Sequence, residues 1–378
     1  MKRAVQGSRI RVLNVFPDFG IGGMQRQCAD RINLMPQHFD HQIVALNGDL
    51  RMTAALTRPD TTPIIDAPRR QPGRPYCVTL VPWLRAQRPD LLLTYGWGST
   101  DVIVAARFAG IRRLIHAQHG FGPLELTRQL RRRLWVRRLL FRRISRLVVP
   151  STTLRAIAQQ LWRVPERRIA FIPSGVDTQR FQSGDGTAIR ARLGIPPGAV
   201  VVGTVGRLDE EKDPEVLIDL LAALDSGADV HAVFVGEGSR RAAVADRAAR
   251  LGLGSRVHFP GFSADPSEYY RAFDVFVLTS RTEQRPLSLL EAMACGLPVV
   301  CTRVGDVIDM VAPAQRALVV SLGDRSALTQ AVDRLVRSAE MRRQLGNGNQ
   351  RHCHQHFDIH EVVARYGRLY EEVLADTA

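Results

Sequence analysis

The stretch from Ser280 to Val300, SRTEQRPLSLLEAMACGLPVV, does most to decide the fold. It predicts a short apolar helix that leads into a buried strand. Pro286 suits the first helical position, where its missing N–H costs nothing, and Gly296 with Pro298 ends the helix. A helix that leads into a buried strand is typical of a parallel sheet covered by helices.

Two carboxylates lie on either side of this helix start. Glu283 is predicted in the loop before the helix, and Glu291 more than one turn inside it. The first N–H groups of a helix have no partner within it, so those near Leu287 and Ser288 are suited to hold an anion such as a phosphate. Acceptors for sugar hydroxyls beside a phosphate site predict a nucleotide sugar as the ligand.

A second segment supports this prediction. Val201–Lys212, VVGTVGRLDEEK, begins as a buried strand that ends at Gly206 and continues as a loop with two cations, Arg207 and Lys212, which are suited to a diphosphate. The chain has 52 arginine and lysine residues, yet only Lys2 and Lys212 are lysines. The alternative interpretation of Lys212 is a solvated partner of neighbouring acids, because exposed ion pairs contribute little.

The rest of the chain alternates strand and helix patterns, which predicts two doubly wound α/β halves with parallel sheets. The predicted strands are Ile10–Phe16, Gln42–Leu46, Asp90–Tyr95, Leu114–Gln118, Leu147–Pro150, Ile169–Ile172, Val200–Val205, Val230–Val235, Val257–Phe259, Val275–Thr279, Val299–Cys301 and Leu318–Val320. The loop-rich stretch Pro173–Pro197 separates the halves, and a binding site is expected in a cleft between them.

Three motifs, taken together and in order, resemble those of the family 4 retaining glycosyltransferases, which have the GT-B fold. They are the E-x7-E signature at Glu283 and Glu291, the G-R-L-x-x-x-K diphosphate clamp at Gly206, Arg207, Leu208 and Lys212, and the I-P-x-G-V-D motif at Ile172–Asp177. Further matches are Gly22 with Gly23, His119 with Gly120, and the VGEGS turn from Val235 to Ser239.

The resemblance implies two Rossmann-like domains that face each other across a cleft. Residues 1–182 correspond to an acceptor-binding domain and residues 183–358 to a nucleotide-sugar-binding domain. In residues 359–378, Ile359–Ala375 is predicted as a helix that returns toward the first domain. One departure from the family pattern is Gln284-Arg285 after the first glutamate, where many members have glycine and an aromatic or aliphatic residue. This change affects the part of the loop that faces the sugar.

The resemblance also implies roles for individual residues. Arg207 and Lys212 stabilise the leaving phosphate in place of a metal ion, Glu283 binds hydroxyls of the transferred sugar, and His119 contacts the sugar or the acceptor. The implied donor-binding residues are Gly22, Gly23, Gly206, Glu237, Gly238, Leu287, Ser288 and the ribose-binding Glu291. His116 is interpreted as structural. No metal site is expected, because no Asp-x-Asp set accompanies the motifs.

The implied reaction is transfer of a sugar, with retention of configuration, from a UDP-type or GDP-type sugar to a hydroxyl of a glycan or lipid-linked acceptor. Bacterial polysaccharide biosynthesis is the expected setting, and no cofactor beyond the donor substrate is expected. Two alternatives stay open: a nucleotide-sugar epimerase of the GT-B fold, and a noncatalytic nucleotide-sugar-binding subunit.

Composition is typical of a large globular enzyme, with 378 residues of which 45% are hydrophobic and 24% charged. The five cysteines are scattered without a CxxC spacing, which argues against a disulfide framework and a zinc site. The polar start of the chain and the lack of a long apolar run predict neither a signal peptide nor a membrane span. A cytoplasmic enzyme is therefore expected.

The net charge of +15 comes partly from one run, RQLRRRLWVRRLLFRR, between Arg128 and Arg143. The apolar residues Leu130, Leu134, Leu140 and Phe141 are interpreted as a stripe beside arginines, the pattern of a helix at an anionic membrane surface. An ordinary solvated helix is the alternative. Nucleic acid is disfavoured, because no binding motif accompanies the charge and aromatic residues make up only 6% of the chain.

Overall fold

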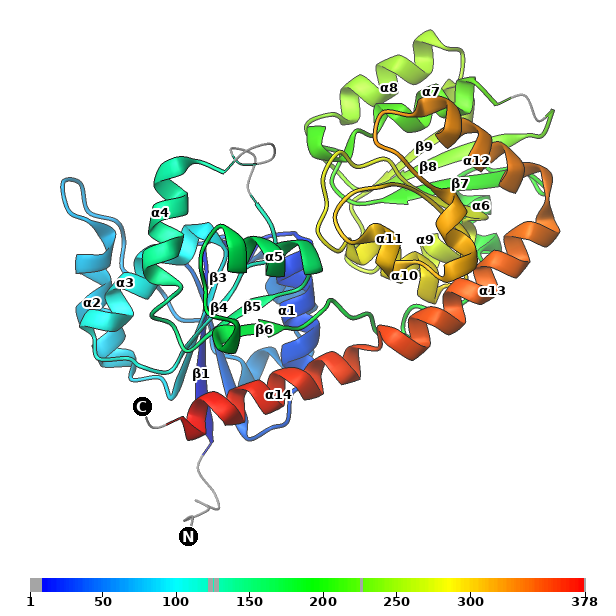
Figure 1. The fold of residues 1–378 in the computed structure, drawn as a ribbon. Helices are drawn as coiled ribbons and strands as arrows, with labels where there is room; N and C mark the ends of the chain where they lie inside the picture. Colours follow the sequence, from blue (N-terminus) through cyan, green and yellow to red (C-terminus); the bar gives the residue numbers. More distant parts are fainter. Residues whose placement is uncertain (1–8, 122–124, 126–128, 225–226, 377–378) are drawn as a thin grey trace. The chain divides into compact units, whose positions relative to one another are not determined.

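The computed structural model describes residues 9–121, 125, 129–224 and 227–376, which form two compact units (Figure 1). The first unit runs to Ser174 and also includes the end of the chain from His360. The second unit is Gly175–Ile359.

The first unit is built on a parallel sheet of six strands. Their order is β2-β1-β3-β4-β5-β6, and their bounds are β1 Ile10–Phe16, β2 Phe39–Ala45, β3 Leu91–Tyr95, β4 Leu114–Ala117, β5 Arg146–Val149 and β6 Ile169–Phe171. Strand β3, LLLTY, is buried along its whole length, as expected for a parallel strand covered on both faces. The helices of this unit are α1 Gly23–Leu34, α2 Tyr76–Gln87, α3 Thr100–Phe108, α4 Arg131–Leu140, α5 Thr152–Gln160 and the terminal α14 Ile359–Ala375.

The second unit repeats this architecture. Its parallel sheet has the order β12-β11-β10-β7-β8-β9, with β7 Val200–Val205, β8 Val230–Val235, β9 Val257–Gly261, β10 Val275–Leu278, β11 Val299–Thr302 and β12 Val319–Val320. Its helices are α6 Thr187–Arg192, α7 Glu215–Ala222, α8 Arg241–Arg250, α9 Ser267–Ala272, α10 Leu287–Ala294, α11 Val307–Met310, α12 Arg325–Arg337 and α13 Ala339–His356. Apolar side chains pack on both faces of the sheet and form its core.

Each of the twelve predicted strands is found, and the prediction of two doubly wound halves is confirmed. Most strand boundaries shift by one or two residues, and two further differences concern β2 and the signature helix α10. Strand β2 begins at Phe39, three residues before the predicted Gln42, and the signature helix α10 begins at Leu287. Pro286 therefore precedes the helix as its N-cap instead of occupying the first helical position, and its extended backbone (φ −65°, ψ 124°) is a conformation that proline readily adopts.

The strand orders define where each sheet can bind a ligand. In the second unit the chain builds β7, β8 and β9 toward one edge and then returns to place β10 on the other side of β7. In the first unit the same reversal lies between β1 and β3. Loops at the carboxyl ends of strands diverge at such a reversal, which is where open α/β sheets bind ligands.

The terminal helix α14 is held in the first unit by a buried cation. Arg31 of α1 is 2% exposed, and its guanidinium lies 4.0 Å from the ring centroid of Tyr366 in α14. The same guanidinium donates to Tyr95 Oη at 2.6 Å, and Tyr370 packs edge-on against Phe39. The predicted terminal helix is confirmed with the same bounds.

The predicted apolar stripe of the arginine-rich run is wrong. Phe141 is fully buried and Leu134 and Leu140 pack against the core, so only Leu130 of the four predicted residues is exposed. The stripe is the inner face of α4, which faces the sheet because burial of those side chains completes the core of the unit. Arg128, where the run begins, lies outside the described residues. Over the described part of the chain, no helix is long and apolar enough to cross a membrane.

Candidate functional site

The loops that follow β7 and β10 are joined at the strand reversal of the second unit. Arg281 donates from its backbone N–H to Glu211 O at 2.8 Å and from Nε to Asp213 Oδ2 at 2.8 Å. Thr279 Oγ1 donates to the carbonyls of Lys212 and Asp213 at 2.8 and 3.0 Å. These contacts fix the loop that carries Lys212 against the loop that carries Glu283.

The central contact of the site is an ion pair between two of the predicted residues. Lys212 Nζ donates to Glu283 Oε1, and Ser280 Oγ donates to the same oxygen at 3.0 Å. The Glu283 side chain is 12% exposed and that of Lys212 is 26% exposed, so both groups remain within reach of a ligand. The structure therefore places the predicted phosphate-binding cation beside the predicted sugar-binding carboxylate.

Arg207, the second predicted cation, is more exposed, with 55% of its side chain accessible. It donates to Asp209 Oδ2 at 2.9 Å and also pairs with Glu211. Asp209 in turn accepts from the backbone N–H and the hydroxyl of Ser239, both at 2.9 Å. Arg207 is thus tethered at the edge of the site by two acids of its own loop.

The VGEGS turn packs directly on the clamp loop. A Cβ at Gly238 would lie 2.4 Å from the carbonyl oxygen of Leu208, and a Cβ at Gly236 would lie 1.9 Å from that of Gly206. Gly206 itself has φ +150°, a conformation that side chains rarely adopt. Close backbone packing therefore explains why the residue at position 238 is a glycine. The carboxylate of Glu237 is exposed and lies 3.5 Å from Arg241.

Glu291 is oriented by a residue that the sequence did not point to. Tyr270 of α9 is fully buried, and its hydroxyl donates to Glu291 Oε2 at 2.7 Å. Burial raises the pKa of Tyr270 well above its usual value, and the nearby carboxylate adds to this effect. The phenol consequently remains a proton donor to Glu291. No motif could have identified Tyr270, because it lies 21 positions before its partner.

The unusual Gln284-Arg285 pair is accommodated by a buried ion pair. Arg285 lies 3.5 Å from Asp306, and their side chains are 5% and 1% exposed. Asp306 also donates from its backbone N–H to Gln284 O at 3.0 Å. Gly305 has φ +50°, and a Cβ there would lie 2.3 Å from Glu283 O, so the loop that carries Glu283 rests on this glycine.

Helix α10 begins four residues after Glu283. Leu287 and Ser288 form its first turn, and no side chain of the described residues caps its N-terminus. The first-turn N–H groups are therefore available to an anion, as the sequence predicted for this helix start.

The predicted residues of the first unit lie at the carboxyl ends of its strands. Gly22 and Gly23 form the start of α1, which follows β1 at the strand reversal. The φ of Gly22 is −176°, which any residue can adopt, so its backbone conformation does not require glycine. A side chain at Gly22 would instead contact the end of Gln25. Because Gly22 has no side chain, no side chain of this residue covers the N-terminus of α1.

His119 follows β4 and is partly buried. Burial, with a smaller effect from the positive charge of Arg31, lowers the pKa of His119 to about 4. The imidazole is therefore neutral near pH 7 and can act as a hydrogen-bonding group but not as a cation. His116 is fully buried within β4, with Nδ1 2.8 Å from Thr94 Oγ1.

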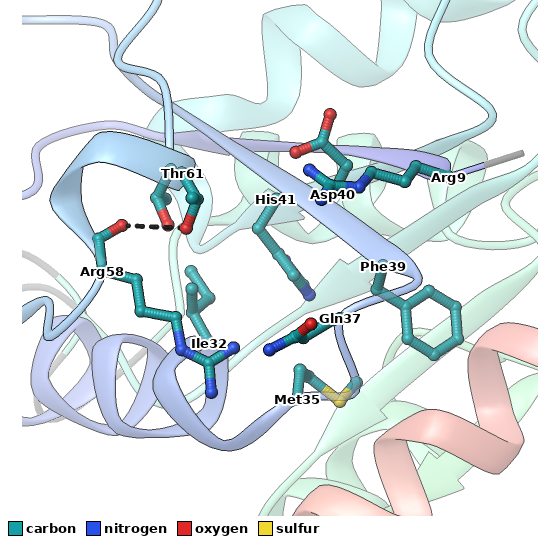
Figure 2. Close-up of a pocket in the computed structure, with 10 residues that line it drawn as sticks. Arg9, Ile32, Met35, Gln37, Phe39, Asp40, His41, Arg58 and Thr61 are labelled. Carbon is teal, nitrogen blue, oxygen red and sulfur yellow. Dashed lines mark hydrogen bonds between the residues drawn. The ribbon is translucent and has the colours of Figure 1, made fainter.

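A separate cavity of about 130 Å³ lies in the first unit (Figure 2). It is lined at the start of β2 by Phe39, Asp40 and His41, with Arg9 and Arg58 nearby. The amino ends of parallel strands lie opposite the edge where such sheets bind ligands. None of the predicted site residues lines this cavity.

Comparison with protein families gives two matches that together span most of the chain. Residues 21–180 match the family model described as Glycosyltransferase Family 4. Residues 185–352 match the model described as Glycosyl transferases group 1. The first match covers most of the first unit and the first few residues of the second unit. The other match lies entirely within the second unit.

Two curated relatives illustrate the similarity. The chain is 32% identical over 279 residues to a D-inositol 3-phosphate glycosyltransferase of Stackebrandtia nassauensis, a match that covers 70% of this chain and 60% of that protein. It is 33% identical over 166 residues to the lipopolysaccharide core biosynthesis mannosyltransferase LpsB of Rhizobium meliloti, covering 42% of this chain and 47% of that protein. The chain thus spans less than two thirds of the length of either relative.

A solved structure is similar over nearly the whole chain. The crystal structure of Anabaena HepE in complex with UDP and glucose has a TM-score of 0.83 to this protein at 21% sequence identity. The match covers 96% of this chain and 100% of that chain. At this level of identity the comparison establishes the shared fold.

Proposed function

Because the chain belongs to family 4 of the glycosyltransferases and has the GT-B fold, as its motifs predicted, we propose that it transfers a sugar from a nucleotide diphosphate sugar to an acceptor hydroxyl. The observation that supports this most directly is the contact between Lys212 and Glu283 at the β7–β10 reversal. This contact supports the proposal because a cation suited to phosphate lies beside a carboxylate suited to sugar hydroxyls, the combination that a nucleotide sugar requires.

The proposed chemistry depends on stabilisation of the leaving group. As the bond between the anomeric carbon and the phosphate oxygen breaks, negative charge grows on the β-phosphate. Lys212, Arg207 and the N–H groups of Leu287 and Ser288 are donors fixed in advance for that charge, without a metal ion. A phosphate that approaches Lys212 competes with Glu283 for its ammonium group and frees that carboxylate for the sugar.

The two carboxylates serve as hydrogen-bond acceptors in this proposal. Glu283 binds hydroxyls of the transferred sugar, and Glu291, oriented by Tyr270, binds the ribose hydroxyls. Retention of configuration is proposed from membership of the family. Gly206, Glu237 and Gly238 are assigned to the nucleotide side of the site.

In the first unit, Gly22, Gly23 and His119 are the proposed contributors. The open start of α1 is suited to phosphate oxygens, and a neutral His119 is suited to a hydroxyl of the sugar or of the acceptor. These assignments rest on their place at the carboxyl ends of β1 and β4.

For substrates and setting, we propose a UDP-type or GDP-type donor and a glycan or lipid-linked acceptor in bacterial polysaccharide biosynthesis. The UDP and glucose bound to HepE and the lipopolysaccharide-related name of LpsB support this choice. The proposed location is the cytoplasm, at the inner face of the plasma membrane.

Thermal stabilisation tests the donor proposal. The purified protein is heated with UDP, GDP, ADP and dTDP sugars in the presence of EDTA, because ligands that bind only the folded state raise the melting temperature. We expect a shift with one nucleotide in the wild type and no shift in Lys212→Ala. Arg250→Ala, which removes an exposed cation at the end of α8, is the matched control and should keep the shift.

Product analysis separates the alternatives. A transferase gives free nucleotide and a glycosylated product only when an acceptor is added. An epimerase converts the donor without an acceptor, and a noncatalytic subunit binds the donor without turnover. A donor shift without any product across a panel of glycan and lipid-linked acceptors would favour the noncatalytic alternative and contradict the transferase.

A further inference from the structure

Helix α4 exposes large apolar side chains on the face that points away from the core. Trp135 is 67% exposed and Leu139 is 56% exposed, and the two are one helical turn apart. Arg138 lies with its guanidinium 5.1 Å from the Trp135 ring and donates to Leu161 O at 2.7 Å. Two large apolar side chains exposed side by side on one helix face form an apolar patch, and such patches mark interaction surfaces.

The opposite face fixes the helix rigidly in this orientation. Arg137 is completely buried and donates to both oxygens of Glu125, at 2.8 and 2.7 Å. Its guanidinium also lies 5.0 Å from the Trp97 ring and 5.3 Å from the Trp162 ring. Because this inner face is anchored, Trp135 and Leu139 cannot turn inward without breaking a buried ion pair.

The charge along the segment that carries the exposed pair has a single sign. Between Glu125 and Glu166 the sequence contains eleven arginines and no acidic residue. Arg131 and Arg132 lie on the same side of the helix as Trp135 and Leu139, and the exposed Arg142 and Arg143 follow its last turn. Within the described part of the chain, no carboxylate forms an ion pair with these four arginines.

We propose that this surface, defined by Arg131, Arg132, Trp135, Leu139, Arg142 and Arg143 and here called the α4 outer face, docks on an anionic lipid bilayer. Tryptophan and leucine enter the interface between headgroups and acyl chains, and the arginines bind lipid phosphates. A second copy of the chain would place like charges together. The docking goes beyond the proposed reaction, because it requires neither donor nor acceptor.

Vesicle sedimentation tests the proposal with the full-length protein. The wild-type protein should sediment with vesicles of phosphatidylglycerol and phosphatidylcholine. It should stay in the supernatant with vesicles of phosphatidylcholine alone. Arg131→Gln with Arg132→Gln should lower the affinity about fivefold for each arginine removed. Trp135→Ala with Leu139→Ser should lower it about tenfold or more.

Matched controls lie elsewhere on the same unit. Arg69→Gln with Arg74→Gln removes the same charge from exposed positions, and Val78→Ser with Phe108→Ala removes exposed apolar side chains. Both pairs should keep the wild-type affinity. Equal losses in controls and α4 variants, or undiminished binding of both α4 variants, would overturn the proposal.

A conservative variant keeps the proposal testable if an α4 double variant folds poorly. Brominated acyl chains should quench part of the tryptophan fluorescence of the wild type, and Trp135→Phe should lose that part although it still sediments. Quenching that is unchanged in Trp135→Phe would contradict insertion of this side chain. Retention of the protein on single-stranded RNA but not on anionic vesicles would overturn the proposal in favour of nucleic acid.

Discussion

Lys212 and Glu283, 71 positions apart in the chain, form an ion pair that joins the loops after β7 and β10. The pair exists because the strand order of the second sheet reverses between these two strands. Each residue therefore has two roles, as the structural partner of the other and as a proposed ligand contact. The two roles can be measured separately.

Loss of Lys212 should affect catalysis far more than stability. Lys212→Met removes a proposed donor to the leaving phosphate, and we expect kcat/KM to fall roughly 10²–10³-fold, the usual effect of losing one such donor. Steady-state kinetics measure this loss. Arg250→Met, an exposed change on α8, should leave kcat/KM unchanged. A Lys212→Met enzyme with wild-type kinetics would exclude the proposed clamp.

The structural role of the same pair is measured by a double-mutant cycle in denaturant. Lys212→Met and Glu283→Gln should each lower the free energy of unfolding, because each leaves a partly buried group without its partner. The double variant should lose less than the sum of both, with a coupling energy of about 1 kcal/mol. Strict additivity would mean that the ion pair contributes nothing to the fold.

Tyr270→Phe should weaken donor binding with little effect on kcat. The phenol orients Glu291, and a hydrogen bond to a charged group contributes about 1.5–3 kcal/mol, so KM for the donor should rise about tenfold or more. Initial-rate kinetics at varied donor concentration separate KM from kcat. The control is Tyr269→Phe, since the hydroxyl of this neighbour accepts from Arg192 at 3.0 Å, outside the site. An equal fall in kcat for both variants would indicate a general structural defect.

The motif residues of the second unit could be singled out from the sequence because their features are local, and their roles stay predictions. A loop after a strand, a proline before a short helix and a rare lysine are all readable along the chain. Tyr270 and Asp306 were missed because their contacts with Glu291 and Arg285 arise only when separate segments of the unit pack together.

Helix α4 shows a different limit. Leucines and arginines are interspersed along this helix, so two of its faces carry apolar side chains. The face that packs on the core is the one on which Arg137 is buried against Glu125. An arginine that is fully buried is an exception to the usual preference for the surface. The sequence pattern therefore predicted the helix but assigned the wrong face to the exterior.

Asp306→Asn should destabilise the second unit through Arg285. Burial lowers the pKa of Arg285, and Asp306 opposes this effect, so removal of the carboxylate leaves a buried cation without its counter-charge. We expect a loss of about 3 kcal/mol in the free energy of unfolding, measured in urea. The further change Arg285→Met should recover most of this loss, because it removes the stranded charge. If the double variant is less stable than Asp306→Asn, the ion pair is not the cause.

The stability of the first unit should fall as the pH drops below about 6.5. Burial lowers the pKa of His41 and of His116 to about 3, and positive charge nearby adds to this effect. In the unfolded chain a histidine titrates near 6.5, so between about pH 6.5 and pH 3 the unfolded state binds more protons. Each buried histidine should therefore cost about 2 kcal/mol of stability between pH 7 and pH 5.

His116→Gln should reduce that dependence, because glutamine can bond to Thr94 Oγ1 but does not titrate. Melting temperatures from pH 5 to pH 7 should fall less steeply with decreasing pH in this variant than in the wild type. His38→Gln removes an exposed imidazole of the same unit and should follow the wild-type curve. If the melting temperatures of all three proteins depend on pH in the same way, protonation of His116 in the folded state costs no stability. The complete burial of His116 within β4 argues against that outcome.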